Sequence, residues 1–191
     1  MHGSKPLRSV RRKAWNIADN AHALTFSTYR RRPIFNDRPA AELFLTALDK
    51  ARHAANFDLY AFVVMPDHCH VLLWPQEEEY QMSTILKAIK SPAAKLILEA
   101  LPTWRSEFVV RTSRGIETRL WQKGGGYDRN ITSVKTMWKT IHYIHGNPVR
   151  KGLCETHLDW PYSSAGAYHG LPTLIPVDLC NWQDDLAKGL E

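Results

Sequence analysis

Two strand-like segments separated by a very short break constrain the fold of this chain most. Residues 57–65, FDLYAFVVM, are rich in β-branched and aromatic side chains, and the run stops at Pro66 and Asp67. Residues 69–74, CHVLLW, resume the same character at once. Proline and aspartate favour turns, so we expect an antiparallel hairpin with a very tight turn. The rest of the chain has to complete a sheet around it.

Further strand and helix patterns lie on both sides of this hairpin. Residues 23–29 alternate between apolar and polar side chains, which predicts a strand. Leucines at helical spacing predict a helix that begins near Asp37. The other expected elements are a helix over residues 83–101 that Pro92 kinks or interrupts, one or two strands within residues 104–122, and a helix over residues 131–144 with Ser133 as N-cap.

This order, β, α, β, β, α, β, α, is the split βαβ arrangement of ferredoxin-like folds with one added helix. We therefore predict an α+β fold with a four-stranded antiparallel sheet. Its first two helices should cover one face, the other face should stay open, and the added C-terminal helix should carry Tyr143. The 191 residues fit one domain, expected at residues 23–170 between a basic N-terminal tail, 1–22, and a C-terminal tail, 171–191.

The balance of charge favours a polyanionic partner. Lysine and arginine number 25 against 19 acidic residues, which gives a net charge of +6, and nucleic acid is the leading class of partner for such a chain. Basic residues concentrate in the first 32 positions. We expect contacts to the phosphate backbone of DNA from Arg11, Arg12, Arg30, Arg31, Arg32 and Lys139.

The cysteine spacing and the hydropathy of the chain indicate where in the cell the protein is expected. The three cysteines are widely spaced, with no CxxC pair and no disulfide framework. The first twenty residues lack the continuous apolar stretch of a secretory signal, and no later run approaches membrane-spanning length. We expect a cytoplasmic, nucleoid-associated protein with no membrane partner.

The hairpin also carries the sharpest chemical pattern, DHCH. Side chains two apart on a strand point the same way, so His68 and His70 should leave the sheet together while Cys69 enters the opposite, core layer. Two adjacent imidazoles make half of a metal site. Satisfied structural histidines are the other reading of the same pattern.

A second pattern lies in the last predicted helix. Tyr143 and Asn147 are four residues apart, so a persisting helix presents a phenol beside an amide oxygen on one face. Pro148 disfavours helical geometry at Asn147, so the last turn should be distorted. Ordinary half-buried packing of the tyrosine is the alternative.

Three segments in this order, VVMPDHCHVLLW, YIHGNPVRKGL and DWPYSS, resemble the single-tyrosine HUH transposases, in particular their REP-associated branch. The similarity spans residues 24–164. It implies that His68 and His70 are the catalytic HUH histidines, that Tyr143 is the nucleophile, and that Asn147 joins the two histidines in binding a divalent metal ion, magnesium or manganese. In the stretch LWQKGGGYDRNI, Gly126 stands where the family usually has the first residue of an aromatic pair.

The same resemblance implies an activity. The protein would nick and rejoin single-stranded, palindromic or hairpin DNA through a 5′-phosphotyrosine intermediate, as a monomer or a homodimer. No nucleotide cofactor is needed, because the phosphotyrosine stores the energy of the bond that was cut, and the sequence has no P-loop.

Two other functions fit the residues alone. One is a ferredoxin-like module that binds single-stranded nucleic acid without chemistry, its histidines being structural. The other is a metal-dependent nuclease in which His68 and His70 surround an activated water.

Overall fold

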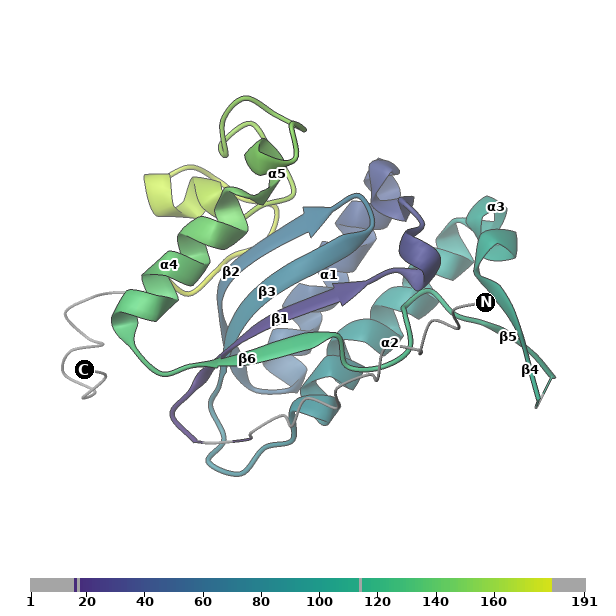
Figure 1. Cartoon of the computed structure of the whole chain (residues 1–191), viewed down its shortest axis with the longest axis horizontal. Coiled ribbons are helices and arrows are strands. Elements are labelled where there is room, and N and C mark those ends of the chain that lie inside the picture. Colours follow the sequence, from purple (N-terminus) through teal and green to yellow (C-terminus); the bar gives the residue numbers. More distant parts are fainter. Residues whose placement is uncertain (1–15, 17, 114, 180–191) are drawn as a thin grey trace, which may run out of the picture.

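The fold is built on one antiparallel sheet of four strands (Figure 1). A computed structural model describes residues 16, 18–113 and 115–179. Strands β1 (Ala21–Ser27), β2 (Phe57–Met65), β3 (His68–Pro75) and β6 (Tyr127–Ile131) lie in the order β2-β3-β1-β6. Every neighbouring pair is antiparallel. The predicted ferredoxin-like α+β fold is confirmed.

Helices α1 (Arg38–Ala54) and α2 (Met82–Ala100) cover one face of this sheet (Figure 1). Their apolar residues recur at helical spacing and meet the odd-numbered side chains of β3 in the main core. Asp37 stands at the N-terminus of α1, as predicted. Helix α2 runs through Pro92 without a break.

The second face of the sheet is not open, and that expectation was wrong. Helix α4 (Val134–His145) packs on it over β2 and β3, and the short α5 (Asn147–Arg150) follows (Figure 1). Met137, Ile141 and Ile144 recur along one stripe of α4 and are buried against the sheet in a second apolar cluster. Ser133 caps α4 by accepting a hydrogen bond from the backbone N–H of Thr136.

The fourth strand of the sheet does not come from residues 104–122, as the sequence suggested, but from β6. The strands expected in that stretch are present as β4 (Val109–Thr112) and β5 (Gly115–Thr118), but they pair only with each other, in a ribbon that projects from the body (Figure 1). A small helical segment, α3 (Pro102–Arg105) and η3 (Ser106–Phe108), precedes this ribbon. β6 is an edge strand in which only Ile131 is buried. Its sequence therefore lacks the apolar alternation that would have marked it.

The segment DWPYSS packs against the edge of the sheet at β2. The backbone N–H of Val64 donates to the carbonyl of Tyr162, and the Ser164 hydroxyl accepts from the N–H of Phe62. Further along, Ile175 is buried in the main core, and the N–H of Asp178 donates to the carbonyl of Leu59. These contacts satisfy backbone groups of β2 that an exposed edge would leave unpaired.

The remaining short elements are η1 (Tyr29–Arg31), η2 (Ile34–Asn36) and η4 (Ala165–His169). None of the helices in the described part of the chain is both long and apolar enough to cross a membrane.

Candidate active site

The two histidines of the hairpin lie side by side at the start of β3. The centroids of the His68 and His70 rings are 5.0 Å apart, and their planes are nearly perpendicular. Cys69 points the other way and is fully buried in the core beneath α1 and α2, where burial raises the pKa of its thiol well above the usual value. The alternation along the strand thus places an imidazole pair on one face and an unreactive thiol in the core.

Each imidazole is held at its Nδ1 atom. Nδ1 of His68 lies 2.6 Å from Oδ1 of Asp67, and Nδ1 of His70 lies 2.8 Å from Oγ1 of Thr25 on the neighbouring β1. When Nδ1 carries the proton, each Nε2 presents a lone pair. A second partner on the far nitrogen is how proteins usually fix a metal-binding histidine.

Burial keeps His70 neutral. Desolvation, with smaller electrostatic contributions from His68, Arg150 and Arg31, lowers the pKa of His70 to about 3. Burial acts to raise the pKa of Asp67, but His68 and Arg31 outweigh it and lower that pKa below its ordinary value. A neutral His70 is suited to metal binding, because the ligand nitrogen must be unprotonated.

Tyr143 lies on α4 facing this pair. Its ring centroid is 5.8 Å from that of His70, with the two planes at 87°. The residue is 53% exposed, unlike the other large side chains that α4 packs against the sheet. A tyrosine in ordinary packing would be more deeply buried, and this ring is instead accessible to solvent beside the imidazole pair.

Asn147 follows directly after the break that Pro148 was expected to cause. Helix α4 ends at His145, Gly146 separates it from α5, and Asn147 is buried. Its amide nitrogen donates to the carbonyls of Tyr143, at 3.0 Å, and Ile144, at 3.5 Å. The amide oxygen takes no part in these two bonds.

The donor set fits a divalent cation. Within residues 18–113 and 115–179, no group of three or more histidine, cysteine, aspartate or glutamate side chains could hold a metal ion. A metal at His68 and His70 therefore needs an amide, hydroxyl or water oxygen to complete its shell, and the amide oxygen of Asn147 is of that type. Two imidazole nitrogens with one amide oxygen suit manganese at least as well as magnesium, which prefers oxygen donors, and zinc accepts the same ligand types.

A cavity of about 640 Å³ opens between β1, β6 and α4 beside these groups. The predicted residues that line it are His70, Lys139 and Tyr143. Tyr127 and Arg129 also line it, and neither was predicted as a site residue. Strand β6 lacks apolar alternation, so no sequence pattern marked these two residues.

A family model for the IS200-like transposases matches residues 18–147, which include the imidazole pair, Tyr143 and Asn147. This chain belongs to the IS200-like transposase family. The predicted family is confirmed.

Two similar proteins carry the name of the REP-associated branch of these transposases. A Haemophilus influenzae protein named for the REP-associated tyrosine transposases is 28% identical over 108 residues, which are 56% of this chain and 58% of that protein. The match thus spans just over half of that relative's length. A solved structure of a REP-associated tyrosine transposase bound to a REP hairpin has a TM-score of 0.66 at 20% identity, covering 91% of this chain and 95% of that one, and so shares its fold.

The three consecutive arginines after β1, Arg30–Arg32, do not form an unpaired basic patch in this transposase. Arg31 pairs with Asp67 at 3.2 Å, and Arg32 pairs with Glu107 at 2.5 Å. The Arg30 guanidinium lies 5.1 Å from the ring centroid of Tyr29. Two of these three predicted DNA contacts therefore already have carboxylate partners. The other two arginines predicted to bind DNA, Arg11 and Arg12, lie outside the described residues.

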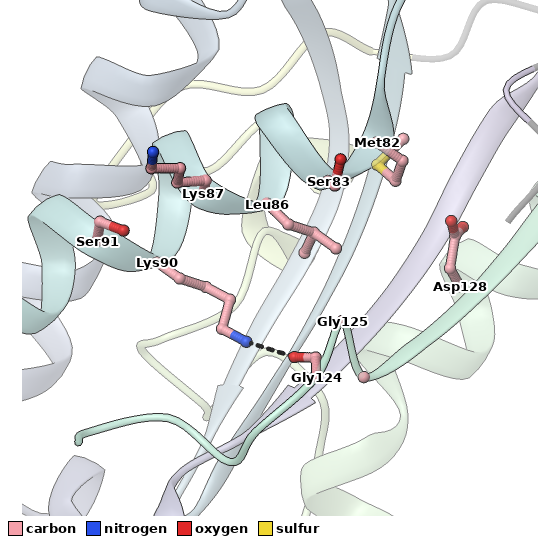
Figure 2. Close-up of a pocket in the computed structure, with 10 residues that line it drawn as sticks. Met82, Ser83, Leu86, Lys87, Lys90, Ser91, Gly124, Gly125 and Asp128 are labelled. Atoms are coloured by element: carbon pink, nitrogen blue, oxygen red, sulfur yellow. Dashed lines mark hydrogen bonds between the residues drawn. The ribbon is translucent and has the colours of Figure 1, made fainter. Parts of the chain in front are cut away.

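A second cavity of the transposase, of about 440 Å³, lies on the opposite side of the sheet from Tyr143, between α2 and the loop Gly124–Gly126 (Figure 2). Figure 2 shows the side chain of Lys90 reaching from α2 to this loop, where its Nζ donates to the carbonyl of Gly124 at 3.0 Å. Burial lowers the pKa of this lysine. The contact holds the loop that leads into β6.

Proposed function

We propose that this transposase nicks and rejoins single-stranded DNA at hairpins, with Tyr143 as the nucleophile. The observation that carries the proposal is the position of the half-exposed Tyr143 ring 5.8 Å from His70, in the wall of a cavity large enough for a nucleotide. The REP hairpin bound to the structural relative supports hairpin DNA as the substrate.

The reaction exchanges one phosphodiester bond for another. The phenol oxygen of Tyr143 attacks the phosphorus and loses its proton, the bond from phosphorus to the 3′ oxygen breaks, and that oxygen takes up a proton. The products are a 5′-phosphotyrosine and a free 3′-hydroxyl. Attack by a second 3′-hydroxyl reverses these steps and joins new strands, without a nucleotide cofactor.

His68, His70 and Asn147 would hold the divalent ion, magnesium or manganese. When bound, such an ion polarises the phosphodiester and stabilises the charge that develops on its oxygens. Asp67 and Thr25 orient the two imidazoles through their Nδ1 atoms. The catalytic contribution of the histidines is thus to fix the phosphate relative to Tyr143.

The cavity supplies the groups that single-stranded DNA needs. Lys139 and Arg129 are placed to contact phosphates, and Tyr127, 41% exposed, offers a ring on which an unpaired base can stack. Arg30, in η1, remains a proposed contact to the DNA backbone.

Because the proposed substrate is DNA, we propose that the protein acts at the nucleoid. Moving a segment needs two cuts, so we propose two copies, as a homodimer, or two successive rounds.

The deciding experiment compares the chain with its Tyr143→Phe variant on labelled DNA hairpins with manganese. The parent chain should give a covalent protein–DNA adduct that survives denaturant, and the variant should give neither adduct nor nick while retaining metal binding. Tyr162→Phe, on the packed DWPYSS segment, is the control and should react normally.

Two results would contradict the proposal. Nicking that survives in Tyr143→Phe would indicate a nuclease that uses activated water. Binding to a broad hairpin library without any adduct from the parent chain would indicate a non-catalytic binding module.

A further inference from the structure

Arg150, the last residue of α5, folds back over the ring of Tyr143. Its guanidinium carbon lies 4.4 Å from the centroid of that ring, well inside the range of a cation–π interaction. The same guanidinium donates a hydrogen bond to the backbone carbonyl of Tyr143. One side chain therefore contacts both the phenol ring and the backbone of the tyrosine.

Gly146 provides the space for this contact. A Cβ atom at position 146 would lie 2.7 Å from Nη1 of Arg150 and 3.1 Å from the carbonyl oxygen of His142. The backbone turns here from α4 into α5, with the N–H of Arg150 donating to the carbonyl of Gly146 at 3.0 Å. Any larger residue at this position would displace the guanidinium.

The arrangement restrains a side chain that would otherwise move. A half-exposed tyrosine on a helix has more than one accessible χ1 rotamer. Here His70 approaches the ring at 5.8 Å between centroids, and the Arg150 guanidinium lies over the ring. Asn147 shares the backbone carbonyl of Tyr143 with Arg150. These contacts define one orientation of the phenol.

We infer that Arg150 is a positioning residue, which holds the Tyr143 ring toward the imidazole pair before DNA binds. The inference rests on the proposed function, since it assigns Arg150 a part in readying the proposed nucleophile. A misplacement of a reacting group by about 1 Å can cost roughly 100-fold in rate. The loss should therefore fall on the rate of the covalent step and leave DNA affinity nearly unchanged.

The first test separates the rate from the affinity. In Arg150→Met, we expect adduct formation at saturating hairpin DNA to slow by about 10- to 100-fold, with the Kd for DNA changed less than twofold. Arg150→Lys should recover only part of the rate, because an ammonium lacks the planar face that stacks on the ring. Lys151→Met, the exposed neighbour, is the matched control and should react at the parent rate. A weakened Kd with an unchanged rate would make Arg150 a phosphate contact and overturn the inference.

Gly146→Ala gives an independent way to displace the guanidinium. We expect it to slow the covalent step in the parent chain and to add little in the Arg150→Met background, because the clash with Nη1 is then gone. Fully additive losses would mean that Gly146 acts through the helix backbone and not through Arg150, which would count against the inference.

A readout without DNA distinguishes failure of the inference from failure of the proposed function. In protein containing 3-fluorotyrosine, the ¹⁹F resonance of Tyr143, assigned with Tyr143→Phe, should shift or broaden in Arg150→Met and stay in place in Lys151→Met. If the parent chain forms no adduct, the proposed function fails, while this spectrum still tests the restraint. An unchanged resonance in Arg150→Met would overturn the inference even if the parent chain reacts.

Discussion

Oδ1 of Asp67 lies 2.6 Å from Nδ1 of His68, and Oδ2 of the same carboxylate lies 3.2 Å from the Arg31 guanidinium. One residue of the tight turn thus links a basic group in η1, just after β1, to an imidazole at the start of β3. Because the turn consists of only Pro66 and Asp67, the carboxylate cannot move far from the ring that it orients. The turn is therefore part of the site as well as the connection between two strands.

Asp67→Asn should weaken metal binding about 10- to 100-fold, the usual cost of losing a partner behind a metal-binding histidine. The amide keeps the shape of the carboxylate but is a weaker acceptor for the N–H of His68. Isothermal titration calorimetry with manganese measures the metal affinity of each variant. Glu107→Gln, which removes the carboxylate partner of Arg32, serves as control and should bind metal normally. Equal affinity in both variants would refute the orienting role of Asp67.

Lys139→Gln should reduce both the affinity for single-stranded DNA and its dependence on salt. Losing one phosphate contact should lower the slope of log K against log salt by about 0.7. Fluorescence anisotropy over a range of salt concentrations measures that slope. Lys87→Gln is a suitable comparison, because Lys87 lines the second cavity on the far side of the sheet. The prediction fails if both variants give the same slope.

Gly126→Ala should destabilise the fold by more than about 3 kcal/mol. A Cβ there would lie 2.1 Å from the carbonyl oxygen of Thr25, and the backbone φ of +81° is already unfavourable for any other residue. Gly124→Ala isolates the backbone strain, since its φ is +99° but nothing lies within 4 Å of the added atom. Gly124→Ala should lower the free energy of unfolding by only about 1–2 kcal/mol. Urea unfolding of the two variants tests the difference.

His145 should make stability fall in mild acid. Its Nε2 lies 2.8 Å from the Ser164 hydroxyl, and burial, with the charges of His157, His142 and His169, lowers its pKa from 6.5 to about 4. Between those values the unfolded chain binds a proton that the folded chain does not. The free energy of unfolding should therefore decrease by about 1–3 kcal/mol as the pH drops from 6.5 to 4.

His145→Gln should make this decrease shallower, whereas His53→Gln, at an exposed position on α1, should leave it unchanged. Urea unfolding at pH 7 and pH 4.5 measures both decreases, in EDTA so that no divalent ion is bound. An identical decrease in the parent chain and His145→Gln would show that other groups control the acid response.

The hairpin and the three long helices could be predicted from the sequence because local patterns determine them. Residues 57–65 form β2 at the predicted bounds, since the β-branched run ends at two strong turn residues. Helix α4 begins one residue after the predicted cap, Ser133. The direction of His68 and His70 followed from the alternation of a strand, which needs no tertiary information.

The parts that could not be predicted depend on contacts between distant segments. β6 has one buried residue, so only its pairing with β1 defines it as a strand. The partner of His70, Thr25, lies 45 positions earlier in the chain. The carboxylates that pair with Arg31 and Arg32 are Asp67, in the hairpin turn, and Glu107, in the segment after α3. Side-chain periodicity reflects local structure and cannot indicate such contacts between distant segments.

The imidazole pair and Tyr143 belong to the same polypeptide, and they meet without help from a second copy. Under the proposed function, a second protomer would therefore add another whole site and would not supply a missing half. Mixing chains that lack the tyrosine with chains that lack a histidine should consequently give no complementation, since neither kind of molecule can lend the other its missing group.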